Sequence, residues 1–277
     1  MYLRGSSLSL RKKRRRGNPL LIILLTAAIA FLVYFNVVVA PDMSPPFVPT
    51  PTITRDPISF EIEADGLAVE GKFLSAIETY QAAINANPRN IDNYLKIARL
   101  QIYSGDYPQA QVNAENAILL NKTSADAFAL LGWAKGLQKQ YLEGERDAQT
   151  AIQLDPNNAI GHAIYAYLLA LRVEIGANEL NTVDLAIEES RTALALDANL
   201  LEARWARGYV LEITSNYAEA VEQYQVAVQL NANVAQLRLA LGRNYMTLGN
   251  YDEAIFEFTK AYSLNPTDPV PNYFISR

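Results

Sequence analysis

Cysteine is absent from this chain of 277 residues, and histidine occurs only once. The absence of cysteine excludes a thiolate nucleophile, a cysteine-ligated metal and a disulfide framework. A single histidine, His162, rules out a multi-histidine metal site and leaves little for histidine-based proton transfer. The motifs GxGxxG, GxxxxGK[ST], HExxH and CxxC are also missing. We therefore predict no catalytic residue, no metal site and no cofactor.

Acidic residues are missing from the first part of the chain. Residues 1–40 contain seven of the 24 lysines and arginines and no Asp or Glu, so the rest of the chain carries a charge balance of -12. Such an acidic body is poorly suited to contact phosphates, and we predict no nucleic-acid partner. Half of the residues are hydrophobic, which excludes a chain that is disordered as a whole.

A membrane anchor is predicted near the N-terminus. Six consecutive basic residues at 11–16 precede an uncharged run at 20–40. As a helix this run spans about 32 Å, enough for a hydrocarbon core of roughly 30 Å. Because basic residues resist translocation, we predict a basic cytoplasmic tail over 1–19 and a single transmembrane helix over 20–40. The rest of the chain then lies outside the cytoplasmic membrane, in a periplasmic or extracellular space.

Two alternatives for this segment are less favoured. A cleavable signal peptide has an apolar stretch of about 7–15 residues, and Pro41 directly after Ala40 would hinder cleavage. A nuclear-localisation or nucleic-acid-binding arm also uses a basic run. The position of the run directly before a spanning segment favours the topological role.

A proline-rich linker is predicted over residues 41–57. Six of these 17 residues are proline, which excludes a helix or central strand and favours an extended polyproline II conformation. At about 3.1 Å per residue, such a spacer reaches roughly 50 Å. PxxP spacing also suits a ligand of SH3-like modules, but those modules are mostly intracellular, so we favour the spacer.

From residue 57 onward the sequence repeats with a period of 34 residues. Pro88 and Pro156 are two periods apart, and Ala198, Ala232 and Pro266 are separated from one another by single periods. The step from Pro156 to Ala198 is eight residues longer than one period, which places an insertion between the two halves of the fourth repeat, around 172–184. Six frames result: 57–90, 91–124, 125–158, 159–200 with the insertion, 201–234 and 235–268.

Small residues recur at fixed places within these frames and predict close approach of helix backbones. Large aromatic residues open the second half of most frames, and glycines separate the two halves, where they end a helix without steric cost. Each frame is therefore predicted to be a helix, a short turn and a second helix. The three small-residue columns are Ala83, Ala117, Ala151, Ala193, Ala227 and Ala261; Ala76, Ala110, Gly144, Ala186, Ala220 and Ala254; and Ala64, Ala98, Gly132, Ala166, Gly208 and Gly242.

This pattern resembles the tetratricopeptide repeat (TPR), whose 34-residue unit contains a leucine-glycine pair, a tyrosine, two small residues and a terminal proline. The segments LLGWAKG, GKFLSAIETYQAAINANP and ALGRNYMTLGNYDEAIFEFTKAYSLNP carry the resemblance. It implies an all-α, right-handed superhelical solenoid of about six repeats over 58–268 with concave and convex faces. Residues 269–277 resemble the start of a seventh repeat, which we interpret as a truncated sequence rather than an open end covered by another subunit.

The family's usual tryptophan in the fourth place of each repeat is absent. Phe60, Tyr94, Phe128, His162, Arg204 and Arg238 occupy that place. His162 is therefore predicted to be a structural histidine in a helix-packing column. The two arginines predict looser packing or charge pairing in the last two repeats.

The resemblance implies that the first helices line the concave face. Trp, Tyr and Arg most often carry binding energy at interfaces, so we predict an aromatic groove with an arginine towards either end. We expect both tryptophans to be exposed in it rather than packed between helices. The predicted partner-binding residues are Arg99, Tyr103, Trp133, Tyr167, Trp205, Tyr209, Arg243 and Met246; Leu95, Ile102, Leu137, Leu171, Glu212 and Leu239 lie on the same face.

The predicted function is a non-enzymatic protein–protein interaction scaffold. The groove suits an extended or helical apolar peptide, and the lysine and asparagine cluster that some TPR domains use to hold a terminal carboxylate is absent. The chain resembles the membrane-anchored TPR proteins of bacterial envelopes. Two alternatives remain: the non-catalytic part of a larger enzyme lost at the C-terminus, or a scaffold that self-assembles into homo-oligomers.

Overall fold

The computed structural model describes residues 18–39, 55–177 and 179–276. The chain divides into two compact units, Met1–Thr54 and Arg55–Arg277, which are described separately. The basic cluster at 11–16 and the linker up to residue 54 lie outside the described residues, and the predictions made for them stay predictions.

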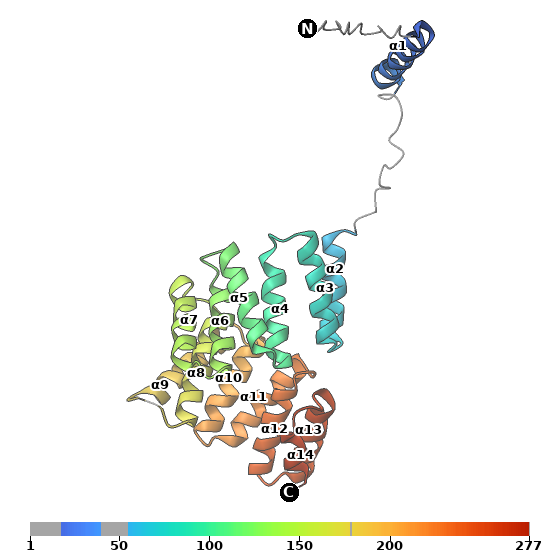
Figure 1. Cartoon of the computed structure of the whole chain (residues 1–277). Coiled ribbons are helices and arrows are strands. Elements are labelled where there is room, and N and C mark those ends of the chain that lie inside the picture. Colours follow the sequence, from blue (N-terminus) through green and yellow to red (C-terminus); the bar gives the residue numbers. More distant parts are fainter. Residues whose placement is uncertain (1–17, 40–54, 178, 277) are drawn as a thin grey trace, which may run out of the picture. The chain divides into compact units, whose positions relative to one another are not determined.

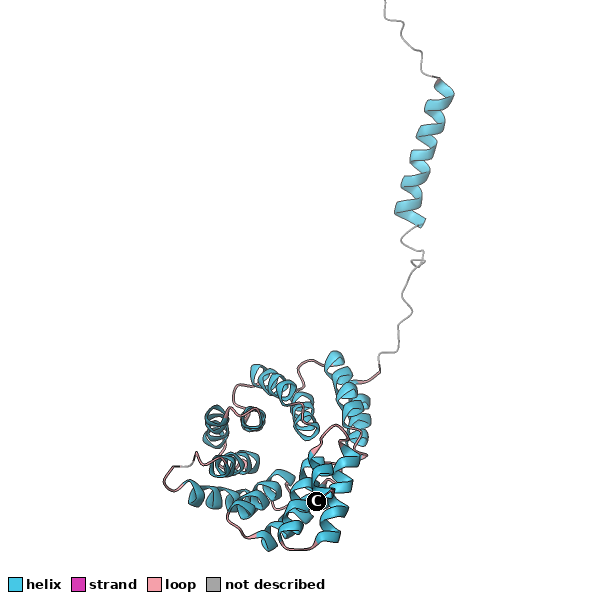
Figure 2. Cartoon of the chain, turned by 60° about the horizontal axis from the view of Figure 1, so that its bottom comes forward, coloured by secondary structure: helices cyan, strands magenta, loops and turns pink. Residues whose placement is uncertain are grey.

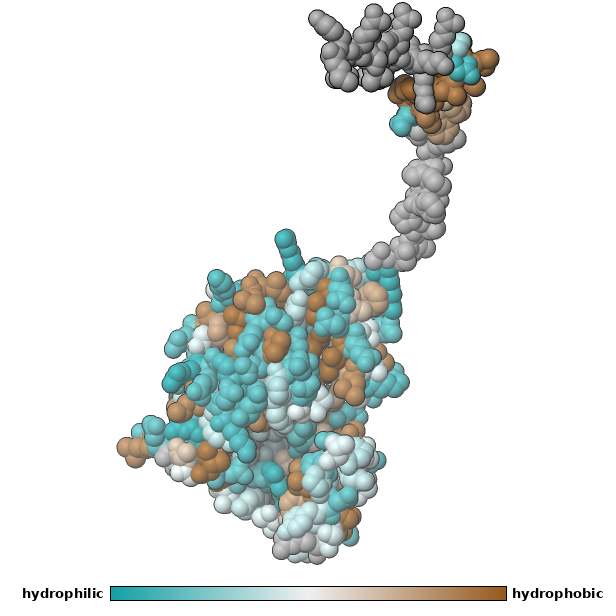
Figure 3. Space-filling view, viewed as in Figure 1, coloured by the Kyte–Doolittle hydropathy of each residue, from teal (hydrophilic) through white to brown (hydrophobic). Residues whose placement is uncertain are grey.

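The first unit contains one apolar helix. The α-helix α1 (Pro19–Tyr34) continues into a short π-helix (Phe35–Val39), and Asn18 caps its N-terminus by accepting a hydrogen bond from the amide of Leu20 at 3.2 Å. The hydroxyl of Thr26 donates to backbone carbonyls one turn earlier, so this polar group is satisfied within the helix. In Figure 3 the visible part of α1 is mostly apolar, with hydrophilic residues among the brown ones. Among the described residues, Pro19–Val38 is the one helix long and apolar enough to cross a membrane.

The second unit is a stack of helical hairpins, and its described residues contain no strand (Figure 1). Each frame supplies one hairpin, and a short helix follows the sixth. The predicted all-α hairpin solenoid is thus confirmed. The hairpins are α2 (Pro57–Val69) with α3 (Phe73–Ala86), α4 (Ile91–Ser104) with α5 (Tyr107–Leu120), α6 (Ala125–Leu137) with α7 (Tyr141–Leu154), α8 (Ala159–Glu174) with α9 (Thr182–Leu196), α10 (Leu201–Ile213) with α11 (Tyr217–Leu230), and α12 (Ala235–Thr247) with α13 (Tyr251–Leu264), followed by α14 (Val270–Ile275).

The predicted small-residue columns are buried where helices pack closely, within a hairpin or between neighbouring hairpins. All six alanines of the Ala83 column are at most 1% exposed. A Cβ atom added to Gly208 would lie 2.8 Å from the ring of Tyr224, and one added to Gly242 would lie 2.6 Å from the ring of Phe258. Only a glycine lets these aromatic rings of the second helix lie directly against the first helix.

The fourth place of each repeat has a second role that the sequence did not reveal. His162 Nε2 lies 3.0 Å from the carbonyl oxygen of Pro156, six residues earlier in the turn between repeats. Arg204 and Arg238 donate from Nε to the carbonyls of Ala198 and Ala232 in the corresponding turns, at 2.8 and 2.7 Å. These side chains provide hydrogen-bond partners for backbone carbonyl groups of the turns between repeats. Charge pairing also occurs, because Arg238 forms an ion pair with Glu257 at 2.8 Å.

Candidate binding site

First helices of repeats that are not neighbours also meet across the interior of the second unit. Tyr103 of α4 donates a hydrogen bond of 2.9 Å to the carboxylate of Glu202 on α10, although the two residues are 99 positions apart in the sequence. Arg99 of α4 forms an ion pair with the same carboxylate at 3.0 Å. In Figure 2 the helices of this unit follow one another around a ring. The bonds of Tyr103 and Arg99 to Glu202 join its second and fifth repeats.

Six rings fill this interior and form what we call the aromatic core. Trp133 and Trp205 meet edge to face with ring centroids 5.3 Å apart, and Tyr167 contacts both tryptophans at 6.2 and 6.1 Å. Such edge-to-face contacts are favourable because the positive edge of one ring meets the negative face of another. The aromatic core consists of Phe73, Tyr103, Trp133, Tyr167, Trp205 and Tyr209.

The aromatic core corrects one prediction made from the sequence. Trp133 is 1% exposed and Trp205 is 6% exposed, so the expectation that both line an open groove is wrong. Tyr103 and Tyr209 are buried as well. The first helices lie so close together that these rings pack against one another and are shielded from solvent. Over much of its length, the inner side of the solenoid is therefore a buried core of aromatic side chains and not an open concave surface.

The two predicted groove arginines are both engaged by carboxylates of the same chain. Glu202, which is 2% exposed, raises the pKa of Arg99 through its negative charge. Arg243 of α12 donates to Glu212 of α10 at 3.0 Å, and Glu212 also accepts a bond of 2.8 Å from Tyr224. Neither arginine is free to hold a partner's carboxylate unless it leaves its own ion pair.

Two adjoining cavities remain open at the C-terminal side of the aromatic core. Their volumes are about 240 and 400 Å³, and they share Glu174, Tyr209 and Arg243 in their linings. Of the predicted groove residues, Tyr167 and Trp205 line the smaller cavity and Met246 lines the larger one. The structure therefore brings part of the predicted set together around these cavities, which we call the inner cavities.

A further pocket lies where the first repeat meets the turn between the fifth and sixth repeats. Asn233 in that turn donates to the carbonyl oxygen of Val69 at 3.4 Å. A Cβ atom added to Gly71 would lie 2.4 Å from Cγ of Asn233, so the contact is close. We call this space, about 400 Å³ in volume, the seam pocket; it is lined by Gly71, Lys72, Phe73, Leu74, Ser75, Tyr103, Ser104, Asn233, Ala235, Gln236, Leu264 and Asn265.

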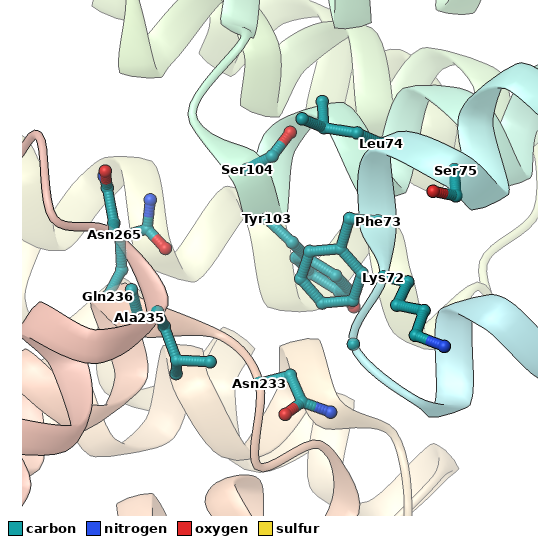
Figure 4. A pocket seen from close by; sticks show the side chains of 12 residues that line it. Lys72, Phe73, Leu74, Ser75, Tyr103, Ser104, Asn233, Ala235, Gln236 and Asn265 are labelled. Atoms are coloured by element: carbon teal, nitrogen blue, oxygen red, sulfur yellow. The ribbon is translucent and has the colours of Figure 1, made fainter.

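The two walls of the seam pocket differ in chemistry (Figure 4). Phe73 and Leu74 of the first repeat supply an apolar wall. The ring of Tyr103 lies beside that of Phe73, with ring centroids 6.1 Å apart. The opposite wall carries the carboxamides of Asn233, Gln236 and Asn265. Among the described residues, Oε1 of Gln236 is buried and has no hydrogen-bond partner.

Sequence reasoning found only Tyr103 of this pocket. Asn233 belongs to the turn motif LNAN and Asn265 to the motif LNP, both of which are explained by turn formation alone. Their meeting with the first repeat depends on contacts 164 residues apart, which no local pattern signals.

Comparison with known proteins agrees with the hairpin architecture. The family model of the tetratricopeptide repeat matches residues 235–268. Among curated proteins, the Protein SGT1 homolog of Oryza sativa subsp. japonica is 28% identical over 144 residues. The aligned part makes up 52% of this chain but only 38% of that protein, so the chain spans about four tenths of the relative that it matches.

Two solved structures share the fold. The first is TTC0263, a thermophilic TPR protein of Thermus thermophilus, with a TM-score of 0.54 and 18% identity over 67% of this chain and 97% of that one. The second is a chain of the APC/C hetero-tetramer Cut9–Hcn1, with a TM-score of 0.56 and 14% identity over 80% of this chain and 42% of that one. At these identities the likeness concerns the fold alone.

Six stacked hairpins with small residues between their helices define a helical-repeat solenoid. The match of residues 235–268 to the tetratricopeptide-repeat model and the shared fold show a solenoid of tetratricopeptide-repeat type, built on the 34-residue period. Proteins built from this repeat bind protein or peptide partners and generally act as scaffolds without enzymatic activity.

Proposed function

We propose that this protein is a membrane-anchored scaffold that holds a segment of a partner protein in the seam pocket. The observation that carries the proposal is the pairing of an apolar wall with a wall of three carboxamides. A carboxamide has donors and an acceptor that match the groups of a peptide backbone. Oε1 of Gln236 is the acceptor without a partner, since Oδ1 of Asn265 already accepts from Thr267. An apolar side chain of the same segment fits against Phe73 and Leu74. The volume of about 400 Å³ is within the range of ligand sites.

Exposure of Leu74 supports this location. Its side chain is 73% exposed although it lies beside the buried ring of Phe73, so an apolar surface extends from the pocket to its rim. Burial of such a leucine by a partner contributes roughly 1.5–3 kcal/mol. The inner cavities are the alternative position for the segment, with Tyr209, Arg243 and Met246 as the groove residues that would contact it.

Photocrosslinking tests where the partner lies. A photoreactive phenylalanine replaces Leu74 at the seam pocket, Met246 at an inner cavity, or Leu119 on α5, and the full chain is irradiated in membranes of its source. Leu119 is the matched control, because it is 74% exposed and lines neither site. We expect a crosslinked partner from position 74 only. A product from position 246 alone would move the segment to the inner cavities, and equal products from 74 and 119 would remove the seam pocket from the proposal.

The membrane anchor and its orientation complete the proposal. The helix Pro19–Val38 supports an anchor by its length and its mean hydropathy of 2.6. The preceding basic cluster supports an N-terminus inside and a solenoid outside, in the periplasmic or extracellular space. An alkaline-phosphatase fusion after residue 57 should be active under this topology. An inactive fusion, with an active β-galactosidase fusion at the same place, would reverse the orientation.

Self-assembly is a second candidate function, and exposed apolar residues at both ends of the solenoid favour it. On α2, Ile58, Ile62 and Val69 are 60, 68 and 82% exposed along one face. On α13, Tyr251 and Phe256 are 65 and 56% exposed. Apolar surface gathered in this way is typical of contact sites. Light scattering of the detergent-solubilised chain tests this candidate, because a monomeric mass at high concentration would remove it.

A further inference from the structure

The eight-residue insertion of the fourth repeat creates a pocket that the repeat pattern does not require. Its volume is about 540 Å³, and it lies between α7, α8 and the beginning of α9, away from the seam pocket and the inner cavities. We call it the insert pocket. Its lining consists of Glu145 and Gln149 of α7, Tyr165, Leu169 and Arg172 of α8, and Glu179, Leu180, Asn181, Thr182, Asp184, Leu185 and Glu188 of the insertion and α9.

Negative charge is in excess in the insert pocket. Four carboxylates, those of Glu145, Glu179, Asp184 and Glu188, face one cation, Arg172. The guanidinium of Arg172 donates to Glu145 at 3.0 Å, to Glu179 at 3.2 Å and to the carbonyl of Ala177 at 2.9 Å. The guanidinium of Arg172 is therefore already bound by Glu145 of α7 and by the loop residues Ala177 and Glu179.

Two of these acids form no ion pair among the described residues. Asp184 and Glu188 are exposed and one turn apart on α9, so both carboxylates lie on the same face of that helix. No ion pair within the described parts of the chain includes either of them. Like charges at this spacing repel each other, and a cation placed between them would relieve the repulsion.

Glu145 at the base of the pocket lacks a partner for one oxygen. Its side chain is 9% exposed, and its Oε2 accepts from Arg172. Its Oε1 is buried and has no hydrogen-bond partner among the described residues. Burial raises the pKa of Glu145 in spite of Arg172, because one guanidinium does not fully replace the water that the carboxylate has lost. A second donor at Oε1 would complete its coordination.

Apolar side chains line the same pocket. Leu169 is 3% exposed and Leu185 is partly buried, whereas Leu180 in the insertion is 92% exposed. A long basic side chain places its methylene stem against apolar surface and its charged head among acids. A bare metal ion gains nothing from contact with these leucines. No cluster of side chains suited to a metal occurs within the described residues.

We propose that the insert pocket binds the lysine or arginine side chain of a basic segment of a partner protein. The head donates to Oε1 of Glu145 and to the carboxylates of Asp184 and Glu188, and the stem lies along Leu169 and Leu185. The volume of the insert pocket exceeds that of one side chain. The exposed Leu180 can therefore also contact the residue that neighbours the bound lysine or arginine in the partner segment. This site is separate from the seam pocket and does not depend on the function proposed for it.

Fluorescence anisotropy tests the proposal with the detergent-solubilised full chain. The probes are fluorescein-labelled peptides of the sequence Gly-Ser-Leu-Xaa-Leu-Ser-Gly with Arg, Lys or Gln at Xaa. We expect the Arg and Lys peptides to bind at least fivefold more tightly than the Gln peptide. Asp184→Asn with Glu188→Gln should weaken the Arg peptide about fivefold, as expected for two exposed charge contacts. Glu145→Gln should weaken it about tenfold through loss of a buried, charged acceptor.

The controls separate this site from general charge attraction and from misfolding. Glu219→Gln with Glu222→Gln on α11 removes the same number of exposed acids outside the pocket and should leave the affinity unchanged. The variant Asp184→Asn with Glu188→Gln changes only exposed side chains, so it remains informative if Glu145→Gln does not fold. Equal binding of the Arg and Gln peptides, or an equal loss in the control, would overturn the proposal. So would competition by spermidine as strong as that by unlabelled Arg peptide, because the occupant would then be a free polyamine.

Discussion

Trp133 of the third repeat and Trp205 of the fifth repeat meet edge to face at the centre of the solenoid, with ring centroids 5.3 Å apart and an interplanar angle of 80°. One complete repeat lies between them in the sequence. Their contact shows that the superhelix curves tightly enough for repeats that are not neighbours to pack directly. In a solenoid whose repeats contact only their neighbours, such a contact does not occur.

The tryptophan pair is predicted to stabilise the fold. Replacement of either Trp133 or Trp205 by alanine should lower the free energy of unfolding by about 3–5 kcal/mol. The double variant should lose less than the sum of the two, with a coupling of about 0.5–1.5 kcal/mol for an aromatic pair. Urea unfolding of the full chain, monitored by circular dichroism, measures the free energy of unfolding of the two single variants and the double variant. Full stability of both single variants would mean that the tryptophans belong to an open groove after all.

Glu202 is predicted to join two distant repeats. It accepts from Tyr103 and pairs with Arg99, so Glu202→Ala leaves a guanidinium and a buried hydroxyl without their partner. We expect Glu202→Ala to lower the free energy of unfolding by about 3 kcal/mol. Tyr103→Phe removes only one neutral donor and should cost about 1 kcal/mol. If urea unfolding shows Glu202→Ala to be no worse than the exposed Glu219→Ala, the link between α4 and α10 does not exist in solution.

His162 is predicted to make stability depend on pH. Its Nδ1 pairs with Glu189 and its Nε2 faces the carbonyl of Pro156, so both ring nitrogens meet acceptors. The bond to Glu189 raises the pKa of His162 above its ordinary value of 6.5, in spite of partial burial. The stabilisation is fully present below pH 6.5, where the imidazole is charged in both states, and is lost as the pH rises through the raised pKa.

The measurement compares two variants with the parent chain. His162→Gln and Glu189→Gln should each be less stable than the parent at pH 5.5, and the difference should shrink by pH 9. Because His162 is the single histidine of the sequence, its nuclear magnetic resonance signal reports the pKa without assignment. A titration midpoint at or below 6.5 would contradict the pairing.

Two glycine-to-alanine substitutions are predicted to have opposite effects. Gly242→Ala puts a methyl group 2.6 Å from the ring of Phe258 and should cost about 1–3 kcal/mol. Gly66 lies within α2 with no atom within 4 Å of an added Cβ. Gly66→Ala should therefore stabilise the chain by about 0.5–1 kcal/mol through better helix propensity. Thermal melts of the two variants check the signs, and an equal response would mean that the small-residue column is not set by packing.

Much of the hairpin architecture was accessible from the sequence because it is local. The Ala83 column and the glycines at 208 and 242 recur at one period, and each acts within a single hairpin or between neighbours. His162 was correctly assigned to structure, since its place in the repeat is a packing position. Its bond to the Pro156 carbonyl was missed because three different residue types make that bond in different repeats.

The candidate sites were less accessible, for a physical reason. Trp133 and Trp205 were placed correctly on the inner side of the first helices, but pattern alone does not tell an exposed inner face from a buried one. The difference depends on curvature, which accumulates from a small rotation at every repeat. Asn233 was assigned to a turn, and its approach to Val69 arises only after the intervening repeats have set the path of the chain.

The sequence by itself determined the helices, their pairing into hairpins and the columns of small residues, because each depends on residues within about one repeat of each other. It also determined the apolar helix at Pro19–Val38, which follows from composition alone. Only the tertiary structure decided that the concave face is filled by an aromatic core, that a seam pocket lies between the first repeat and the turn before α12, and that the insertion surrounds an acidic pocket. Those features depend on how the angles between six repeats add up, and small angular differences at each step decide which distant side chains meet.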